Sequence, residues 1–479
     1  MLLSNIPNII NCNKIYNLKK KDVFFNEIST NSKKINKRTI FVAVPINNFK
    51  KNYIQESLNN GALAIISDKY NRNISATQFI VNNINQSLIT LLRYLKPHPP
   101  LNSIGVTGTN GKTSVVWFVS KICSLIQHPI KSYGTLGYFI NAKKVEKSFL
   151  TTPEFEILYQ RAFAKKKNNI FNFICEVSSH SLSQNRISNF PINIAAITNI
   201  SHDHLDYHKT FHNYKKTKFK LFFNYLREND IAVINDNIIG INLVKKKLLN
   251  RKCKIITYGT SKSDVNIISK YNKIEIKVYN SKYFAVLSDY KNFELENISC
   301  AICCCISLGI KINQIIKSLP NLPKPKGRSE LVGKLNNGSK IYVDYAHTPD
   351  ALKKILITNT IAKIKPNVLF GCGGERDKSK RSSMGFFADK YANKIYVTDD
   401  NPRNENPQKI RNDILSKCPR GMEIPNRKKA IQTAITDLDK KEILIIAGKG
   451  HENKQIIRNK SISFDDTKIT KTFLNVNKV

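Results

Sequence analysis

The segment Gly108-Thr-Asn-Gly-Lys-Thr-Ser114 follows an apolar run and precedes a helical pattern, which is the setting of a phosphate-binding loop. In such a loop, glycines let backbone N–H groups surround phosphate oxygens, the lysine supplies positive charge, and the next hydroxyl can bind Mg²⁺. The general pattern has a further glycine where this chain has Val106, so the motif is a variant. It favours a nucleoside phosphate ligand over the alternative, an incidental helix N-terminus.

Two further motifs come directly after apolar runs. Glu176 opens the segment Glu176–Arg186, and a carboxylate level with a phosphate-binding loop is well placed to hold Mg²⁺. The next run leads into Thr198–His208, whose last seven residues include three histidines and two aspartates. Such a cluster could bind zinc. We favour one catalytic histidine beside Mg²⁺, because that reading suits the neighbouring loop.

The elements that must position these residues follow a repeated strand–helix pattern. The chain has 479 residues, and at about 150 residues per domain this length suggests three domains. Proline-rich breaks at Lys96–Pro100 and Leu319–Gly327 predict domains 1–98, 99–325 and 326–479. Expected strands are 39–44, 62–67, 101–106, 171–175, 194–198, 231–234, 340–343, 367–370, 394–398 and 442–446, with a helix over 114–126. Their alternation with helices predicts doubly wound parallel α/β sheets, whose ligands bind beyond the carboxyl ends of the strands.

The formal net charge is +42, from 77 Lys and Arg against 35 Asp and Glu. Hydrophobic residues make up 41% of the chain, which excludes disorder for most of it. A basic chain can bind nucleic acid, but the basic residues are spread along the whole sequence instead of being concentrated. We therefore expect a solvated, lysine-rich surface that suits small anionic substrates.

The ten cysteines include a cluster at Cys300, Cys303, Cys304 and Cys305. Adjacent cysteines suit small buried side chains on a helix, and no second pair follows at the spacing of a zinc site. No run of 18 apolar residues occurs, and the N-terminus lacks the pattern of a signal peptide. We expect a reduced, soluble, cytoplasmic protein with no membrane partner.

In these motifs and their order, the chain resembles the Mur ligases of peptidoglycan precursor synthesis. The resemblance covers nearly the whole length and continues through Thr151-Thr152, Tyr214 with Lys218, Gly327–Glu330, Asp344–Asp350, Gly371–Asp377, Asp399–Arg403 and Ala447–Glu452. It implies a UDP-binding α/β domain, a central P-loop ATPase domain with a doubly wound parallel sheet, and a C-terminal Rossmann-like domain that binds an amino acid. Within the family, the chain is most similar to ligases that add the third residue and form UDP-MurNAc-tripeptide.

The family reaction is ATP-dependent amide formation, in which a substrate carboxylate takes the γ-phosphoryl group of ATP and the acyl-phosphate is then attacked by an amine. The resemblance implies ATP as co-substrate and Mg²⁺ as cofactor. It implies the catalytic residues Lys112, Glu176, His204 and Lys218, and the metal ligands Thr113, Glu176, His204 and Lys218 if the lysine is carbamylated. It implies contacts to ATP from Gly108, Thr109, Asn110, Gly111, Lys112, Thr113, Ser114, Asn297, Arg328, Asp344 and His347.

The resemblance also implies the two other substrate sites. The UDP-MurNAc-dipeptide would contact Thr30, Ser32, Thr151, Thr152, Ser178, Gln184 and Arg186. The amino acid would contact Arg376, Asp400, Asn401, Pro402, Arg403, Gly448 and Glu452. The motif Asp400–Arg403 resembles that of ligases specific for meso-diaminopimelate, because an arginine can grip the carboxylate at the far end of that amino acid.

Alternative functions are a lysine-adding ligase, a folylpolyglutamate synthetase and, in another class, a nucleic-acid-binding NTPase. The synthetase is disfavoured because it needs neither a UDP-binding domain nor the motif Asp400–Arg403. We expect a monomer whose partners are ATP, UDP-MurNAc-L-Ala-D-Glu and meso-diaminopimelate.

The chain departs from the family pattern mainly in the first domain. Asn31-Ser-Lys33 replaces Asp-Ser-Arg, and Phe49-Lys50 replaces Asp-Gly. Glu294 stands where the family has Asn, beside the adenine contact, and Leu150 replaces Asn. The uridine pocket is therefore expected to differ most, with the chemistry kept.

Overall fold

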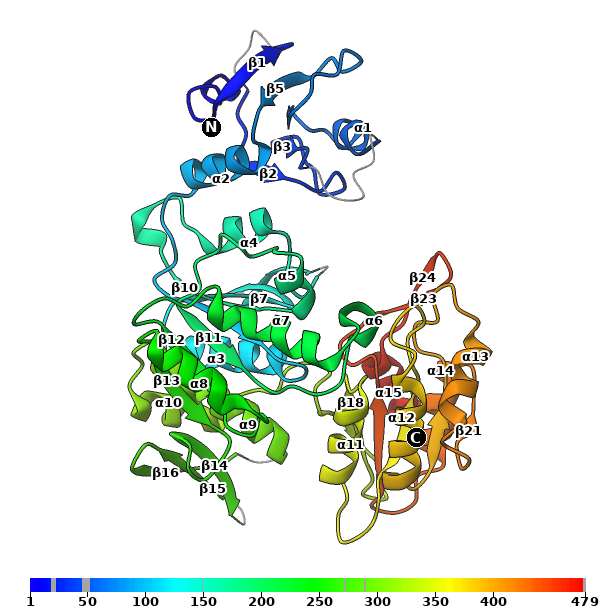
Figure 1. Cartoon of the computed structure of the whole chain (residues 1–479). Helices are drawn as coiled ribbons and strands as arrows, with labels where there is room; N and C mark the ends of the chain where they lie inside the picture. The colour runs from blue at the N-terminus through cyan, green and yellow to red at the C-terminus, as the bar shows by residue number, and fades with distance from the viewer. Residues whose placement is uncertain (19–22, 45–51, 149, 271–272, 288–289, 477–479) are drawn as a thin grey trace.

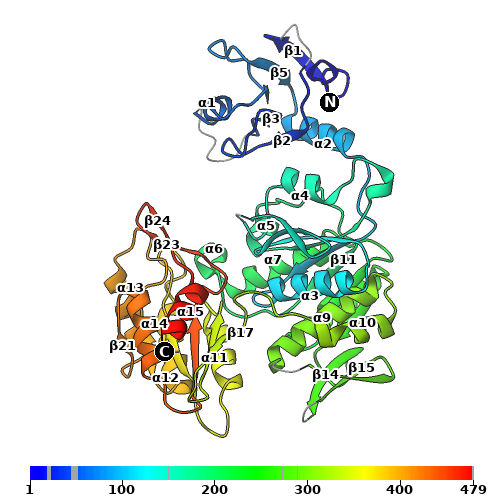
Figure 2. The ribbon, with the colours of Figure 1, turned by 180° about the vertical axis from the view of Figure 1, so that it is seen from behind.

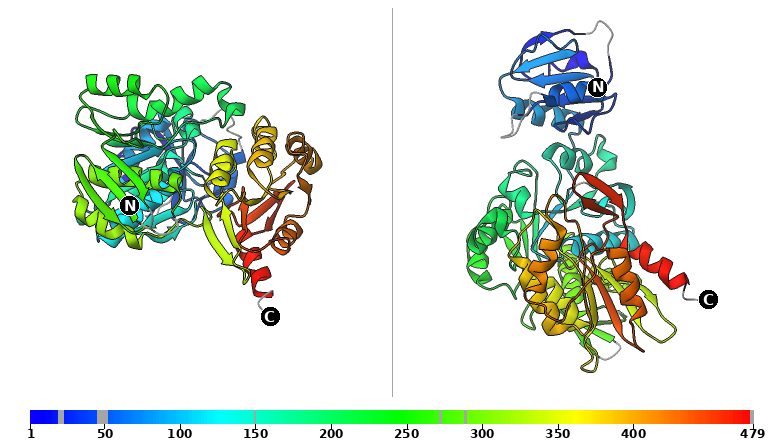
Figure 3. Two further views of the ribbon diagram at one scale, coloured as in Figure 1. Left: turned by 90° about the horizontal axis from the view of Figure 1, so that it is seen from below. Right: turned by 90° about the vertical axis from the view of Figure 1, so that its right-hand side faces the viewer.

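The computed structural model describes residues 1–18, 23–44, 52–148, 150–270, 273–287 and 290–476. The altered pair Phe49-Lys50 lies outside these ranges. Three sheets form three bodies: the first (blue) is stacked on one end of the central body, and the third (yellow to red) lies beside the central one (Figures 1 and 3). The two proline-rich breaks separate the strands of the three sheets from one another, and we propose the division 1–98, 99–325 and 326–479.

The first body is a five-stranded sheet in the order β1-β5-β4-β3-β2, parallel except for β1. Every residue of β3 and β4 is buried, as their apolar runs predict, and α1 lies between them in the chain. The elements are β1 (Cys12–Tyr16), β2 (Glu27–Ser29), β3 (Thr39–Val42), α1 (Asn52–Asn59), β4 (Ala64–Ser67), β5 (Thr77–Val81) and α2 (Ile84–Leu95).

The central body contains an eleven-stranded sheet whose middle is parallel, in the order β13-β12-β11-β6-β10-β7. Helices cover both faces: α7 and α8 are seen in Figure 1, and α3, α9 and α10 from behind in Figure 2. Neighbouring residues of β10 enter different cores, with Phe173 and Cys175 on one face and Ile174 on the other. Burial on both faces explains why these strands read as continuous apolar runs.

The central body contains these parallel strands and helices, in chain order: β6 (Ser103–Thr107), α3 (Lys112–Leu125), β7 (Ile130–Gly134), α4 (Phe155–Ala162), β10 (Asn172–Glu176), α5 (Ser179–Ser183), β11 (Ile194–Ile197), α6 (Leu205–His208), α7 (Phe211–Phe223), β12 (Ile231–Asn235), α8 (Ile241–Asn250), β13 (Lys254–Tyr258), α9 (Asn292–Ser307) and α10 (Ile312–Ser318). The cysteine cluster lies on α9, where its four side chains are free thiols with no exposed surface, as predicted.

Antiparallel strands extend both edges of the central sheet, and the sequence patterns did not predict them. At one edge lie β8 (Gly137–Ile140) and β9 (Lys143–Glu146); at the other lie β14 (Val265–Lys270), β15 (Lys273–Val278) and β16 (Ser281–Ala285). In the part of the chain that the structure describes, no helix is both long and apolar enough to cross a membrane.

The third body is a six-stranded sheet in the order β17-β18-β22-β19-β20-β21, parallel except between β17 and β18. Its elements are β17 (Glu330–Lys334), β18 (Lys340–Asp344), α11 (Pro349–Thr358), β19 (Asn367–Phe370), α12 (Lys380–Tyr391), β20 (Ile395–Val397), α13 (Pro407–Leu415), β21 (Met422–Glu423), α14 (Arg427–Thr436), β22 (Ile443–Ala447), the hairpin β23 (Lys454–Ile457) and β24 (Lys460–Ser463), and α15 (Asp466–Val476). A buried ion pair joins α14 to α15, with Arg427 Nε and Nη2 each 2.8 Å from an oxygen of Asp466.

A polar clamp on α4 attaches the first body to the central one. Gln160 pairs with the backbone of Ile28 at the edge of β2, donating to its carbonyl at 2.9 Å and accepting from its N–H at 3.3 Å. Glu156 accepts hydrogen bonds from the Thr30 hydroxyl at 2.7 Å and from the Thr30 N–H at 3.2 Å. Burial raises the pKa of the Glu156 carboxyl, and the Thr30 hydroxyl opposes this rise.

Candidate functional site

The phosphate-binding loop lies between β6 and α3, as the motif predicts. Gly108 and Gly111 have φ angles of 143° and 87°, which favour glycine. Neither has room for a side chain, because a Cβ would lie 1.8 Å from Thr198 Oγ1 at Gly108 and 2.2 Å from Asn297 Oδ1 at Gly111. Val106, where the general pattern has glycine, is a fully buried core residue of β6. The variant loop therefore begins only after the strand.

The loop after β11 holds the phosphate-binding loop in shape. Asn199 accepts from the Asn110 N–H at 3.0 Å and donates to the Asn110 carbonyl at 3.1 Å. Its own carbonyl accepts from the Thr109 N–H at 2.8 Å, and Thr198 Oγ1 donates to the Asn110 carbonyl at 2.5 Å. These contacts hold the loop in one conformation, and a preorganised loop binds phosphate more tightly.

Two lysines meet at the carbonyl groups of this loop. Lys112 Nζ donates to the carbonyls of Gly108 and Thr109, and Lys218 Nζ donates to that of Gly108, all at 2.8 Å. Lys218, on α7, is 1% exposed and lies 4.5 Å from the ring centre of Tyr214. Burial, together with the charge of Lys112, holds the pKa of Lys218 well below its ordinary value. Lys218 is thus buried beneath the phosphate-binding loop and is not a surface lysine.

Glu176 at the end of β10 is the centre of a hydroxyl-lined group. One carboxylate oxygen accepts from the Thr113 hydroxyl at 2.9 Å and from the Thr135 hydroxyl at 3.2 Å. The other accepts from the Thr135 N–H at 2.7 Å. Gly134 leaves room for this carboxylate, since a Cβ there would lie 2.3 Å from Glu176 Oε1. Hydroxyl and carboxylate oxygens are the hard ligands that suit Mg²⁺.

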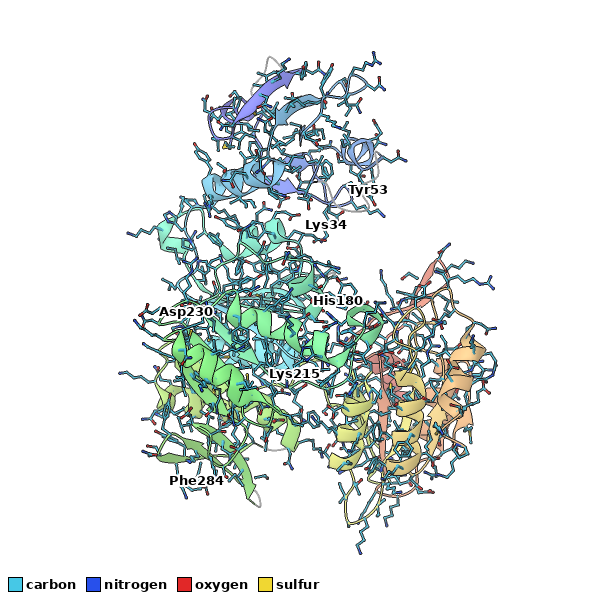
Figure 4. All side chains as sticks on the ribbon, viewed as in Figure 1. Lys34, Tyr53, His180, Lys215, Asp230 and Phe284 are labelled. Carbon is cyan, nitrogen blue, oxygen red and sulfur yellow. The ribbon has the colours of Figure 1, made fainter. Side chains whose placement is uncertain are left out.

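The histidine-rich segment does not assemble a zinc site in the part of the chain that the structure describes, where no group of three or more His, Cys, Asp or Glu residues could hold a metal ion. His204 is in the left-handed region, with φ of 55°, and its Nε2 lies 3.3 Å from Asp203 Oδ2. Burial lowers the pKa of His204 to about 3. His204 and His180 both line a cavity between the central and third bodies, called the main cavity below. His180 lies on the side of the central body that faces the third body (Figure 4).

A second group of hydroxyls surrounds the end of β10. Thr152 Oγ1 donates to the Glu176 carbonyl at 2.9 Å and accepts from the Ser178 N–H at 2.9 Å. Arg186 Nη1 donates to the Thr152 carbonyl at 2.6 Å, while its buried Nε has no protein partner among the described residues. Together with Thr151, these residues present donors to the main cavity, as a site for an anionic substrate requires.

The third body reaches the phosphate-binding loop through Arg328. Its Nη2 donates to Thr113 Oγ1 at 3.2 Å, and its guanidinium lies 4.4 Å from the ring centre of Tyr345. Asp344 accepts from the N–H groups of Ser329 and Ala346, both at 2.7 Å, so it shapes the turn that carries Arg328. His347 Nδ1 lies 2.8 Å from the Tyr345 carbonyl, and burial lowers the pKa of His347 to about 4.

The loop after β20 forms the outer wall of the main cavity. Arg403 has φ of 52°, and its Nη1 donates to the Gly374 carbonyl at 2.7 Å. Burial and the neighbouring Arg376 lower the pKa of Arg403. Asn401 Nδ2 donates to Glu452 Oε2 at 2.8 Å. Two guanidinium groups and a carboxylate in one wall suit a ligand that carries both a carboxylate and an ammonium group.

These groups line one cavity of about 410 Å³ between the central and third bodies. Of the predicted site residues, it brings together Thr109, Asn110, Gly111, Lys112, Thr113, Thr151, Thr152, Glu176, Ser178, Arg186, His204, Arg328, His347, Arg376, Asp400, Asn401, Arg403, Gly448 and Glu452. A smaller adjoining cavity is lined by Ser114, Asn297 and Asp344, together with Phe293 and Glu294. Its place beside the phosphate-binding loop suits the nucleoside part of a nucleotide.

Other predicted residues do not line either cavity. Thr30 and Ser32 lie in the first body, where Thr30 binds Glu156 and Ser32 Oγ donates to Glu56 at 2.5 Å. Gln184 is exposed at the end of α5, and Pro402 contributes a turn that packs on Gly374. Gly108 is the first residue of the phosphate-binding loop, and Lys218 lies beneath that loop. The substrate contacts of all six of these predicted residues stay predictions.

The structure also places residues at the site that the motifs did not single out. Thr135 holds Glu176, Tyr345 stacks on Arg328, and Lys380 lines the main cavity. Lys449 is fully buried behind Asn401 and Glu452. A signal was available for Lys449, which stands within the matched segment Ala447–Glu452. None was available for Thr135, which follows β7 without a motif of its own.

Two family models match the chain: the Mur ligase middle domain over residues 106–305 and the Mur ligase glutamate ligase domain over residues 327–450. The UDP-N-acetylmuramoyl-L-alanyl-D-glutamate--2,6-diaminopimelate ligase of Rickettsia montanensis is 38% identical over 465 residues, covering 94% of this chain and 96% of the relative. The protein of the same name from Wigglesworthia glossinidia brevipalpis is 35% identical over 489 residues, covering 95% and 97%.

Solved structures agree with these sequence matches. A structure titled UDP-N-acetylmuramoyl-L-alanyl-D-glutamate--2,6-diaminopimelate ligase has a TM-score of 0.61 at 30% identity and covers 95% of this chain and 96% of its own. MurF ligase from Thermotoga maritima has a TM-score of 0.66 at 18% identity, covering 95% and 98%. The latter shows the shared fold alone.

Proposed function

Because the chain belongs to the Mur ligase family, it is an ATP-dependent, amide-forming ligase, and we propose that it adds meso-diaminopimelate to UDP-MurNAc-L-Ala-D-Glu. One observation carries this proposal. A single cavity joins the phosphate-binding loop, the Glu176 group and the wall formed by Arg376, Arg403 and Glu452. Phosphoryl donor, carboxylate acceptor and amine can therefore meet in one space, as amide formation through an acyl-phosphate requires.

ATP would bind with its phosphates on the loop Gly108–Ser114 and its nucleoside in the smaller cavity. The fixed backbone N–H groups of the loop and the N-terminus of α3 attract phosphate oxygens. Arg328, poised above Thr113, adds positive charge from the third body. The substrate carboxylate attacks the γ-phosphorus, the bond to the β-phosphate oxygen breaks, and ADP leaves.

The residues around Glu176 fit Mg²⁺, because the Thr113 hydroxyl and a buried carboxylate already lie 2.9 Å apart with their oxygens facing one cavity. We assign Mg²⁺ to Thr113 and Glu176, with His204 and a carbamylated Lys218 supporting a second ion. Bound Mg²⁺ would neutralise charge on the phosphate oxygens. Carbamylation joins the neutral Lys218 amine to CO₂ and releases a proton; the lowered pKa of Lys218 favours the neutral amine.

The acceptor substrate would lie along Thr151, Thr152, Ser178 and Arg186, with Gln184 farther out. Arg186 offers an unused buried Nε to its carboxylate. Thr30 and Ser32 remain the proposed uridine contacts, although the Thr30 hydroxyl already binds Glu156. Uridine recognition would therefore involve the clamp between the first two bodies.

The amine would enter from the wall formed by the third body. Arg403 and Arg376 suit the far carboxylate of meso-diaminopimelate, and Glu452 with Asn401 suits the ammonium group at the same far end. The near amino group, as the neutral amine, then attacks the acyl carbon and loses a proton. The tetrahedral adduct collapses by breaking the bond from carbon to the phosphate oxygen, and phosphate leaves with the amide formed. L-Lysine lacks the far carboxylate, so this wall disfavours a lysine-adding ligase.

Transfer of oxygen from substrate to phosphate tests the reaction. The acceptor carboxylate is labelled with ¹⁸O, and the released phosphate is analysed by mass spectrometry in the presence of ATP, Mg²⁺ and meso-diaminopimelate. The proposal predicts one ¹⁸O atom per phosphate, because one carboxylate oxygen leaves with the phosphoryl group. Phosphate without label would contradict the acyl-phosphate route.

The remaining assignments are also proposals. The free cysteines and the ATP requirement suit the cytoplasm, where we place the reaction, and we expect a monomer. Nucleic acid is not an expected partner. Retention of DNA on filters at about 0.15 M salt would contradict this expectation.

A further inference from the structure

Lys449 is a fully buried lysine in the loop that follows β22. It stands between Gly448 and Gly450, whose φ angles of 107° and 52° favour glycine. Lysine is almost never fully buried unless its ammonium group is paired, because removing the charge from water is costly. The burial of Lys449 therefore calls for a specific set of partners.

Two partners of Lys449, Asn401 and Glu452, belong to the wall that also carries Arg376 and Arg403, here called the amino-acid wall. Its Nζ donates to the Lys454 carbonyl at 2.6 Å and to Asn401 Oδ1 at 3.1 Å, and lies 3.4 Å from Glu452 Oε2. Asn401 Oδ1 also accepts from the Ile456 N–H at 2.9 Å. With two donors at its oxygen, the Asn401 amide can present only its NH₂ group to Glu452.

Glu452 lies among charges of both signs. Burial and the nearby Asp400 raise the pKa of Glu452, and the Lys449 ammonium group opposes this rise. Arg403 and Arg427 also lie within electrostatic reach, as does the Tyr345 hydroxyl. Lys449 is the cation that contacts the Glu452 carboxylate directly from beneath the wall.

We propose that Lys449 is a positioning residue that fixes the Asn401 amide and the Glu452 carboxylate in the arrangement that receives the ammonium group of the incoming amino acid. This inference rests on the proposed function, because it takes Glu452 as the group that meets that ammonium. Lys449 itself lies behind Asn401 and Glu452 and would not touch the substrate. Lys449 would act by setting the position of the negative charge of Glu452 in this wall.

Lys449→Met removes the ammonium group and keeps most of the side-chain length. Lys460→Met, at the exposed start of β24, is the matched control for loss of one positive charge. Phosphate release is measured against meso-diaminopimelate and against ATP over a range of pH. We expect KM for meso-diaminopimelate to rise at least about tenfold in Lys449→Met, because a charge-assisted contact is lost, with KM for ATP changed less than about twofold.

The pH profile separates positioning from general damage. Without Lys449 the pKa of Glu452 rises further, so the acidic limb of kcat/KM for meso-diaminopimelate should move to higher pH by about one unit. The limb measured with ATP as the varied substrate should stay in place. An unmoved limb, or equal losses for both substrates, would overturn the inference.

A double-mutant cycle with Glu452→Gln gives a second test. If Lys449 acts through Glu452, adding Lys449→Met to Glu452→Gln should change KM for meso-diaminopimelate by less than about threefold. Losses that multiply would overturn the inference. Lys449→Gln replaces Lys449→Met in both tests if the methionine variant does not fold. Failure of the wild-type protein to use meso-diaminopimelate would instead contradict the proposed function.

Discussion

Arg403→Ala tests the amino-acid wall most sharply. In the structure, Arg403 Nη1 is held by the Gly374 carbonyl, while Nε and Nη2 have no hydrogen-bond partner among the described residues. That free edge can give a carboxylate two parallel, charge-assisted hydrogen bonds. Each bond to a charged group contributes about 1.5–3 kcal/mol, so we expect a loss of about 3 kcal/mol. This loss corresponds to roughly a hundredfold in kcat/KM for meso-diaminopimelate.

The assay measures phosphate release while meso-diaminopimelate and ATP are varied in turn. KM for ATP should change less than about threefold, because Arg403 does not line the cavity assigned to the nucleoside. Arg458→Ala is the matched control, since Arg458 has the same φ of 52° and is exposed in the neighbouring hairpin. Equal losses for both substrates would show damage to the fold. A loss below about threefold for meso-diaminopimelate would refute the contact.

Three further perturbations follow from the same geometry. Lys218→Ala should lower turnover at least roughly a hundredfold, with partial rescue by short-chain carboxylates that replace the missing oxygen ligand; unchanged turnover would remove Lys218 from the site. Arg427→Met should lower the free energy of unfolding, measured in urea, by about 3–5 kcal/mol, because it leaves the Asp466 carboxylate buried and unpaired. The double variant Arg427→Met, Asp466→Asn, which removes that unpaired charge, should lose less, and an equal or larger loss would contradict this reason. Burial lowers the pKa of His208 to about 4, so His208 is held neutral in the folded protein. Between about pH 6.5 and 4 the unfolded chain therefore binds one more proton than the folded chain, and the free energy of unfolding should fall as the pH drops through this range. His208→Asn should flatten that fall in urea titrations, and an unchanged slope would assign it to other groups.

Many of the parallel strands and the phosphate-binding loop could be predicted because burial on both faces leaves a plain signature, although the buried parallel strands β5 and β7 were not among those expected. β19 has the predicted bounds, and β11 and β18 differ by one residue. The antiparallel edges could not be predicted in this way. In β9 and β16 most residues are exposed or half-buried, so polar side chains interrupt the apolar pattern.

The site was predictable where residue types are uncommon and hard to read where they are abundant. Glu176 and the motif Asp400–Arg403 stand out in the sequence, and Glu176 and all of that motif but Pro402 line the main cavity. Lys218 and Lys449 are buried lysines in a chain with 77 basic residues, and burial depends on packing between segments far apart in the chain. Residue type alone could not distinguish them from surface lysines, and only the match of motifs pointed to Lys218.

The most direct test of the proposed reaction compares two amines. Phosphate release is measured with ATP, Mg²⁺ and UDP-MurNAc-L-Ala-D-Glu, first with meso-diaminopimelate and then with L-lysine at the same concentrations. We expect release with meso-diaminopimelate and little with L-lysine, because only meso-diaminopimelate offers a far carboxylate to Arg403 and Arg376. Release with L-lysine alone would keep the ligase and contradict the amino-acid wall, and no release with either amine would contradict the proposed function.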